Sequence, residues 1–232
     1  MAEPILQTSA ETDLTSSDNT VDVTEPAGIN DDDIILIWCA VDGNPTGFAS
    51  AGFDLVFEDT FTDSTPTLAL LIKRASGESG VYPVTWGGGA EQGRFMSQRI
   101  SGCRVGGAQL DVIDVISPET EADSTSITAT ELISTEVDTL VISGCAVDRD
   151  RVDSGDTAST NSFTTVGTSG SSGGAGGAGL ICGEKDLAGV GGSGSCLFGT
   201  WSTGDTIVAR MINLGSVEPA VPSGFSQAVI IS

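Results

Sequence analysis

The chain has 232 residues, with 9 Lys and Arg against 32 Asp and Glu, a formal net charge of -23 and no histidine. Without histidine, Ser-His-Asp and Cys-His catalysis are excluded, as are His-ligated zinc, haem and non-haem iron sites. The negative charge opposes binding to nucleic-acid phosphates and to anionic membranes, because the electrostatic free energy of both contacts is repulsive.

The N-terminal segment is acidic: residues 1–31 carry seven acids and no Lys or Arg. This segment has neither the basic region nor the apolar stretch of a secretory signal. The longest apolar run, residues 34–41, has eight residues, whereas a membrane-spanning helix needs roughly 20. We therefore expect a soluble protein, in which residues 1–19 form an acidic N-terminal arm.

Short apolar runs alternate with polar residues along the chain, separated by clusters of Gly, Pro, Asp, Asn and Ser. This pattern is typical of antiparallel β-strands, whose successive side chains point to opposite faces. No stretch has an apolar period of 3.6 residues over three turns, so little helix is expected. The predicted strands are residues 20–24, 34–41, 53–58, 67–73, 81–86, 94–100, 110–116, 126–131, 140–147, 162–166, 180–183, 195–201, 206–214 and 227–231.

A comparison of the chain with itself aligns residues 20–42 with residues 126–148, at an offset of 106. Both segments contain Cys-Ala-Val-Asp, which begins at Cys39 and at Cys145. Later in each half a Thr-Trp pair occurs, ending at Trp86 and at Trp201. We predict that one set of strands is used twice, in pseudo-repeats at about residues 20–104 and 126–215.

Two architectures follow from such a duplication: two small sandwiches in tandem, or one larger sandwich to which both halves contribute strands. No Pro-rich or charged linker separates the halves, and residues 110–116 resemble a strand where a linker would lie. We therefore expect an all-β fold, an antiparallel two-sheet sandwich of jelly-roll-like type, in a single domain over residues 20–232.

The five cysteines form an odd set without Cys-x-x-Cys spacing, which disfavours a metal ribbon or a redox motif. Cys39 and Cys145 lie inside apolar strand patterns, where a small buried thiol is the expected state. A disulfide between Cys182 and Cys196 is an alternative. Because no signal peptide is present, we predict free thiols at all five positions, Cys103 included.

Two acidic clusters flank predicted strands and are candidates for calcium, which binds several oxygen ligands. Their members are Asp31, Asp32, Asp33, Asp148, Asp150, Asp153 and Asp156. The second cluster breaks the EF-hand spacing, because Val152 occupies the fifth position and Asp153 the position that requires Gly. Arg149 and Arg151 supply counter-charges within it. We expect solvated loops there, with calcium as the alternative.

The glycine-rich run at residues 169–179 is predicted to be a flexible surface loop. It does not match a phosphate-binding loop, because no Gly-Lys-Ser/Thr follows it. Trp38, Trp86 and Trp201 are expected in the core, which leaves few aromatic platforms for a sugar. We predict no catalytic residue, no cofactor and no metal ligand.

Four segments carry a family resemblance: DIILIWCAVDG at residues 33–43, AGFDLVF at 51–57, LALLIKR at 68–74 and RISG at 99–102. In their acidic turns, apolar strands and Gly-aromatic turns they resemble a diffuse group of phage and prophage structural proteins. The similarity runs through most of residues 20–215. It departs after Asp148, where the Gly-aromatic turn is missing, and at residues 216–232, which add a strand-like piece.

The resemblance implies a virion β-sandwich. The leading expectation is a non-enzymatic decoration or cement protein on the outside of the assembled phage head. Its partners would be the major capsid protein and copies of itself, and it would join the virion after synthesis in the host cytoplasm. A tail fibre or receptor-binding adhesin of the same fold is the first alternative, although the chain has no coiled-coil heptads for a fibre stem. A polysaccharide-active hydrolase that uses two carboxylates is the second.

Overall fold

The computed structural model describes residues 3–60, 66–78, 80–148, 161–169, 177–199 and 205–216. Within these ranges the regular structure consists of antiparallel strands and one 3-10 turn, η1 (Gln109–Val112). The prediction of an all-β antiparallel protein is confirmed. No helix in the described part of the chain is long and apolar enough to cross a membrane.

The first half of the chain builds two sheets from its own strands. A five-stranded sheet has the order β1-β8-β3-β6-β5, and a three-stranded sheet has the order β2-β7-β4. The strands are β1 (Ile5–Asp18), β2 (Thr20–Thr24), β3 (Ile34–Val41), β4 (Thr46–Ser50), β5 (Asp54–Thr60), β6 (Thr67–Arg74), β7 (Val81–Gly87) and β8 (Glu91–Ser101).

The second half builds three sheets. The largest has the order β10-β18-β13-β15-β14, with β9 also paired to β18, and two small sheets pair β11 with β17 and β12 with β16. The strands are β9 (Ile113–Ile116), β10 (Thr120–Ser124), β11 (Ile127–Ala129), β12 (Ile133–Ser134), β13 (Thr139–Asp148), β14 (Thr164–Ser169), β15 (Ala178–Leu187), β16 (Gly191–Gly192), β17 (Cys196–Phe198) and β18 (Asp205–Leu214).

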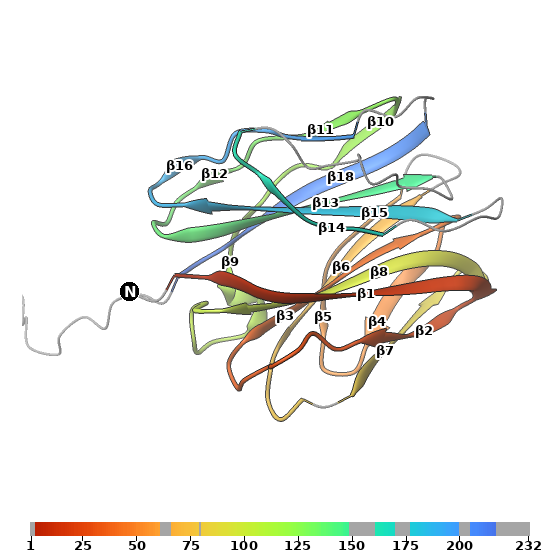
Figure 1. Ribbon diagram of the computed structural model, residues 1–232, viewed down its shortest axis with the longest axis horizontal. Helices are drawn as coiled ribbons and strands as arrows, with labels where there is room; N and C mark the ends of the chain where they lie inside the picture. Colours follow the sequence, from red (N-terminus) through yellow and green to blue (C-terminus); the bar gives the residue numbers. More distant parts are fainter. Residues whose placement is uncertain are drawn as a thin grey trace, which may run out of the picture.

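The two large sheets pack against each other, as Figure 1 shows with the second half above the first. Their shared core contains Leu36 and Trp38 from β3 facing Leu140, Ile142 and Ala146 from β13. The opposite face of each large sheet is covered by the small sheets of the same half, which form two separate outer cores. The molecule is therefore a stack of sheets with three apolar cores between them.

This stacking explains why β3 is apolar along its whole length and why β13 is apolar at most of its positions. All residues of β3 are buried, and in β13 all but the last are. A strand in the middle layers has no solvated face, so both sets of alternating side chains are selected to be apolar. The outer strand β2 shows the contrasting pattern, with Val21 and Val23 buried between exposed polar residues.

The described residues form five sheets, whereas the sequence predicts a sandwich of two. The physical reason is that each large sheet needs apolar cover on both faces. Backbone pairing within these sheets stays inside each half, while side chains from both halves fill the shared core.

The segment predicted as an acidic arm, residues 1–19, lies in the sheet over residues 5–18. There it forms β1, which pairs with β8 at the sheet edge. Its half-buried positions alternate with exposed ones, and they include small or polar residues such as Thr8, Ala10 and Thr12. Because those side chains are weakly hydrophobic, the alternation is not visible as an apolar period. The predicted strand at residues 227–231 lies outside the described residues.

Candidate interaction surface

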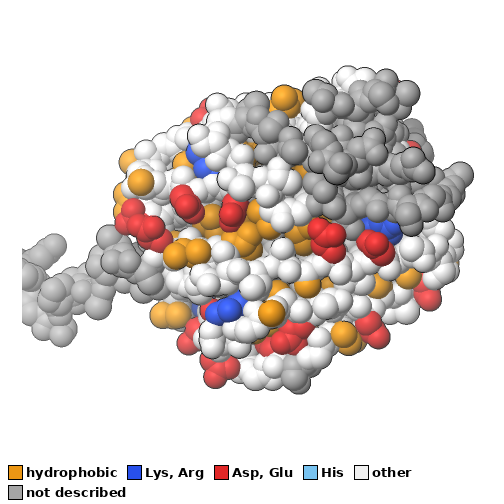
Figure 2. All heavy atoms as spheres, viewed as in Figure 1, with side chains coloured by type: hydrophobic (Ala, Val, Ile, Leu, Met, Phe, Trp, Pro, Cys, Tyr) orange, Lys and Arg blue, Asp and Glu red, His pale blue; other side chains and the backbone are white. Residues whose placement is uncertain are grey.

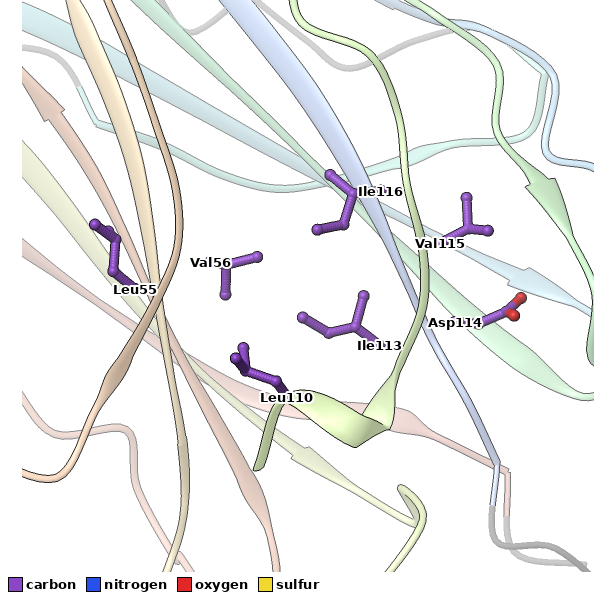
Figure 3. Close-up of a pocket in the computed structure, with 7 residues that line it drawn as sticks. All are labelled: Leu55, Val56, Leu110, Ile113, Asp114, Val115 and Ile116. Carbon is purple, nitrogen blue, oxygen red and sulfur yellow. The ribbon is translucent and has the colours of Figure 1, made fainter. Parts of the chain in front are cut away.

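An open apolar groove lies where the edges of the two large sheets meet. It has a volume of about 310 Å³ and is lined by Leu55, Val56, Leu110, Ile113, Asp114, Val115 and Ile116. Figure 3 shows Val56 of β5 and Ile113 and Ile116 of β9 pointing toward one another, with Leu110 of η1 at one end. The groove therefore brings together residues that are 54 to 61 positions apart in the chain.

Local sequence explains why both walls are irregular at the groove. β5 carries a bulge between Leu55 and Phe57, so that Val56 is the extra residue. β9 ends at Ile116 because Pro118 has no N–H to continue the ladder with β18. Ser117 closes the break: its N–H donates to the carbonyl of Met211, and its hydroxyl accepts from the Met211 N–H, both at 2.9 Å.

Asp114 is the charged residue of the groove lining, and its carboxylate points to the opposite side of β9 (Figure 3). There it accepts hydrogen bonds from Ser134 at 3.0 Å, from the Thr135 N–H at 2.8 Å and from Asn213 at 3.1 Å. Burial by itself raises the pKa of Asp114, but hydrogen bonds from Thr135, Ser134 and Asn213 outweigh it and lower the pKa. The carboxylate is therefore satisfied, and the groove surface that remains is apolar.

A second polar group lies between the halves, where Asp59 of β5 binds Arg210 of β18. The two side chains are 2.6 Å apart, and the Arg210 guanidinium lies 4.9 Å from the centre of the Phe57 ring. Burial raises the pKa of Asp59 to about 6, although Arg210 opposes that shift. Burial and a hydrogen bond with Glu121 raise the pKa of Glu119 to about 7. The Arg210 guanidinium therefore interacts favourably with the carboxylates of both Asp59 and Glu119 at this junction.

In the described part of the chain no group of three or more potential ligands is placed to hold a metal ion. Asp33 is buried and pairs with Arg99 at 2.6 Å, and Asp31 accepts from the Gly77 N–H at 3.0 Å. Asp148 accepts from Thr206 at 3.3 Å. Asp150, Asp153 and Asp156 lie outside the described residues, as do Arg149 and Arg151.

The five thiols are free, as predicted, and all of them are buried, including Cys39 and Cys145, for which burial was predicted. Cys182 belongs to the core between the halves and Cys196 to the outer core of the second half, so a sheet separates them and the alternative disulfide is wrong. Burial raises the pKa of Cys39 and Cys182 well above the ordinary range, that of Cys103 to about 12 and that of Cys196 to about 11. Such thiols are protonated and poorly nucleophilic at neutral pH.

The predicted core positions of two tryptophans are confirmed. Trp38 is fully buried and donates its indole N–H to Gln98 at 2.9 Å, and Trp86 stacks on Phe48 and Phe95. Trp201 and residues 170–176 of the glycine-rich run lie outside the described residues. The sequence interpretation did not predict the groove: five of the seven residues 110–116 are apolar, but their pattern does not show that Leu110 and Ile116 remain exposed.

Comparison with models of protein families, with curated proteins and with solved structures finds no match for this chain.

Proposed function

We propose that this protein is a non-enzymatic structural component of a phage particle that decorates the outside of the assembled head. The proposal joins the resemblance of residues 33–43, 51–57, 68–74 and 99–102 to phage structural proteins with three properties of the molecule. These are its nested strand pairing, its rigid stack of sheets and its acidic outer surface.

The nested pairing is the observation that carries the proposal. In the first half the first strand pairs with the last, the second with the seventh and the third with the sixth: β1 with β8, β2 with β7 and β3 with β6. A long hairpin folded over on itself gives this order, and jelly rolls are built from such a hairpin. We propose a jelly roll in each half, since jelly rolls occur in viral capsid and lectin domains.

The same nesting supports the proposal that the two halves are copies of one strand set. The order β10-β18-β13-β15-β14 repeats β1-β8-β3-β6-β5 strand for strand, and β11-β17 repeats β2-β7. Asp32 and Asp138, which the offset of 106 aligns, both have positive φ, at 71° and 53°. Non-glycine residues rarely adopt this conformation, so the shared turn before β3 and β13 is a specific likeness.

Mechanical stiffness and charge suit a protein that reinforces a shell. The three cores bury nearly all the large side chains of the middle sheets, so the halves cannot slide without opening packed contacts. On the face shown in Figure 2, acidic side chains are spread widely and basic ones are few. A net charge of -23 keeps such a protein soluble at high copy number and away from packaged nucleic acid.

Labelled particles test the proposal. The native thiols are buried, so a Val190→Cys variant, whose position is 64% exposed, carries one accessible thiol for a gold or fluorescent label. Particles containing the unsubstituted protein are the matched control for background labelling. Many labels arranged over the head lattice would support decoration. A few labels at the tail would favour the adhesin instead, and particles without label would contradict both.

A further inference from the structure

The described chain ends beside the apolar groove. Gly215 donates its N–H to the carbonyl of Val112 at 2.8 Å. The backbone of Ser216 pairs with that of Cys103 in an isolated antiparallel β-bridge. Val112 is the last residue of η1, whose Leu110 forms one end of the groove. The described chain therefore ends close to η1, which forms one end of the groove, and residues 217–232 follow from there in the sequence.

The composition of that segment differs from the rest of the chain. Residues 219–232 contain no charged side chain, in a protein whose net charge is -23. Residues 227–231 read Gln-Ala-Val-Ile-Ile, which is rich in the β-branched residues that favour strands. The ten residues 217–226 reach at most about 33 Å, whereas the four residues of β9 extend over only about 13 Å. The segment is therefore long enough to lie anywhere along the groove.

The groove offers apolar surface without a group that would select a small polar ligand. Leu55, Leu110 and Ile116 are 40%, 41% and 37% exposed, and Asp114 faces the other way. Small-molecule sites usually bring several polar groups together inside an apolar pocket. The groove also lies between the edge strands β5 and β9, whose outer edges can accept an added strand.

We propose that residues 227–231 of the same chain bind in the groove between β5 and β9 as an added strand. Backbone hydrogen bonds to an edge strand would hold the segment, and alternate side chains would fill the apolar space. A second copy of the protein would bring its own net charge of -23 to this surface, whereas the tethered segment adds none at residues 219–232 and has a high effective concentration. This inference does not rest on the proposed virion role.

Disulfide cross-linking tests the location of the segment, because the five native thiols are buried. Ile116→Cys, in the groove, is combined with Val229→Cys or with Ile230→Cys in the full chain, under mild oxidation. Neighbouring residues of a strand point to opposite faces, so one of the two pairs should form an intramolecular disulfide and the other should not. The product is read as a monomer by mass and by gel mobility.

The matched control is Ile133→Cys with the same two partners. Ile133 is 59% exposed and lies four residues before Val137, whose carbonyl accepts from Ser216 at 3.3 Å, so an unattached segment would reach it readily. Equal cross-linking at positions 116 and 133, or none at position 116, would overturn the proposal. Cross-linked dimers would also overturn it, because they would place a second copy in the groove.

Hydrogen exchange gives a second measurement that needs no cysteine. In a chain that ends at Ser216, amides of β5 and β9 should exchange at least several-fold faster than in the full chain, while those of β2 and β7 should not change. Unchanged exchange in β5 and β9 would contradict the proposal. If the shortened chain does not fold, the cross-linking result alone decides.

Discussion

The two halves of the molecule pair their strands in the same order but fill their outer cores differently. In the first half Trp86 lies 5.6 Å from Phe48 and 5.7 Å from Phe95, ring centre to ring centre, under a three-stranded sheet. In the second half the outer core contains Phe163 and Phe198 together with small residues such as Ala129 and Cys196, under two-stranded sheets. Strand order is therefore the same although the side chains that fill the outer cores differ.

Where the two halves meet, their side chains are complementary in size. Trp38 of β3 faces Gly144 of β13, and a Cβ placed on Gly144 would overlap the indole ring. These are aligned positions at the offset of 106. Two large residues would not fit face to face at this point, so one half supplies the ring and the other the space.

The largest expected effect comes from removing that contact. Trp38→Ala should lower the free energy of unfolding by about 3 to 5 kcal/mol, since it empties a fully buried site. Gly144→Ala should cost about 1 to 3 kcal/mol through overpacking. Urea unfolding measures both values.

A double-mutant cycle shows whether these two costs share one contact. In the Trp38→Ala background, Gly144→Ala should cost far less, because the ring that it would strike is gone. Gly189→Ala is the control, since no atom lies within 4 Å of its added methyl. Strictly additive costs for the pair would argue against direct packing of the halves at this point.

The next largest effect concerns the ion pair between the halves. Arg210→Gln leaves Asp59 without its cation and should cost about 1 to 3 kcal/mol at pH 8. At pH 5 the cost should be smaller, because Asp59, with a pKa of about 6, is then largely protonated. Arg104→Gln is the control: its partner Glu136 and Arg104 itself are more exposed, so little cost and little pH dependence are expected. Equal cost at both pH values for Arg210→Gln would refute this account.

A smaller effect is expected from pH in the unsubstituted protein. The pKa of Glu119 is about 7 and that of Asp59 about 6 in the folded protein, against about 4 in an unfolded chain. Between these values the folded state holds more protons, so stability falls as the pH rises from about 4 to about 7. After allowance for solvent screening we expect on the order of 1 kcal/mol, or roughly 2 to 4 °C in Tm.

Glu119→Gln isolates the contribution of that carboxyl group to the pH dependence. The variant should have a flatter dependence of Tm on pH and a higher Tm at pH 8. Asp123→Asn, at an exposed acid of the same region in β10, should leave the slope unchanged. A Glu119→Gln slope equal to that of the unsubstituted protein would show that other acids dominate.

The smallest expected difference is between the halves in thiol labelling during unfolding. Cys39 lies in the outer core of the first half and Cys145 in that of the second, and both are fully buried. If the shared core couples the halves, a thiol reagent should modify both at one urea concentration, with no reaction before the transition. Separate midpoints, read by mass spectrometry of the peptides, would show that each half unfolds by itself.

The strands that the sequence predicted best are those with the strongest patterns. Residues 20–24 and 34–41 match β2 and β3, because Val21 and Val23 alternate with polar residues and β3 is uniformly apolar. β4 and β1 were missed: Thr, Gly and Ser weaken the pattern, although backbone pairing holds them in their sheets. The predicted strand at residues 110–116 is half correct, since η1 precedes β9.

The groove could not be predicted, because it depends on two sheet edges from different halves. Val56 and Ile116 are 60 residues apart in the chain, and nothing in either local pattern places them together. The junction pair Asp59 and Arg210 has the same origin. Such sites form when sheets pack on one another, because the packing determines which side chains come into contact.

By itself the sequence determined the all-β class, the free thiols, the core tryptophans Trp38 and Trp86, and the exclusion of histidine chemistry. These follow from local rules, because alternation and composition act on neighbouring residues. Only the tertiary structure decided that the large sheets stack, that residues 5–18 complete a sheet, and that an apolar groove remains open. Those features depend on contacts between residues that are distant in the sequence. The free energy of such contacts is set by shape complementarity, such as that between Trp38 and Gly144.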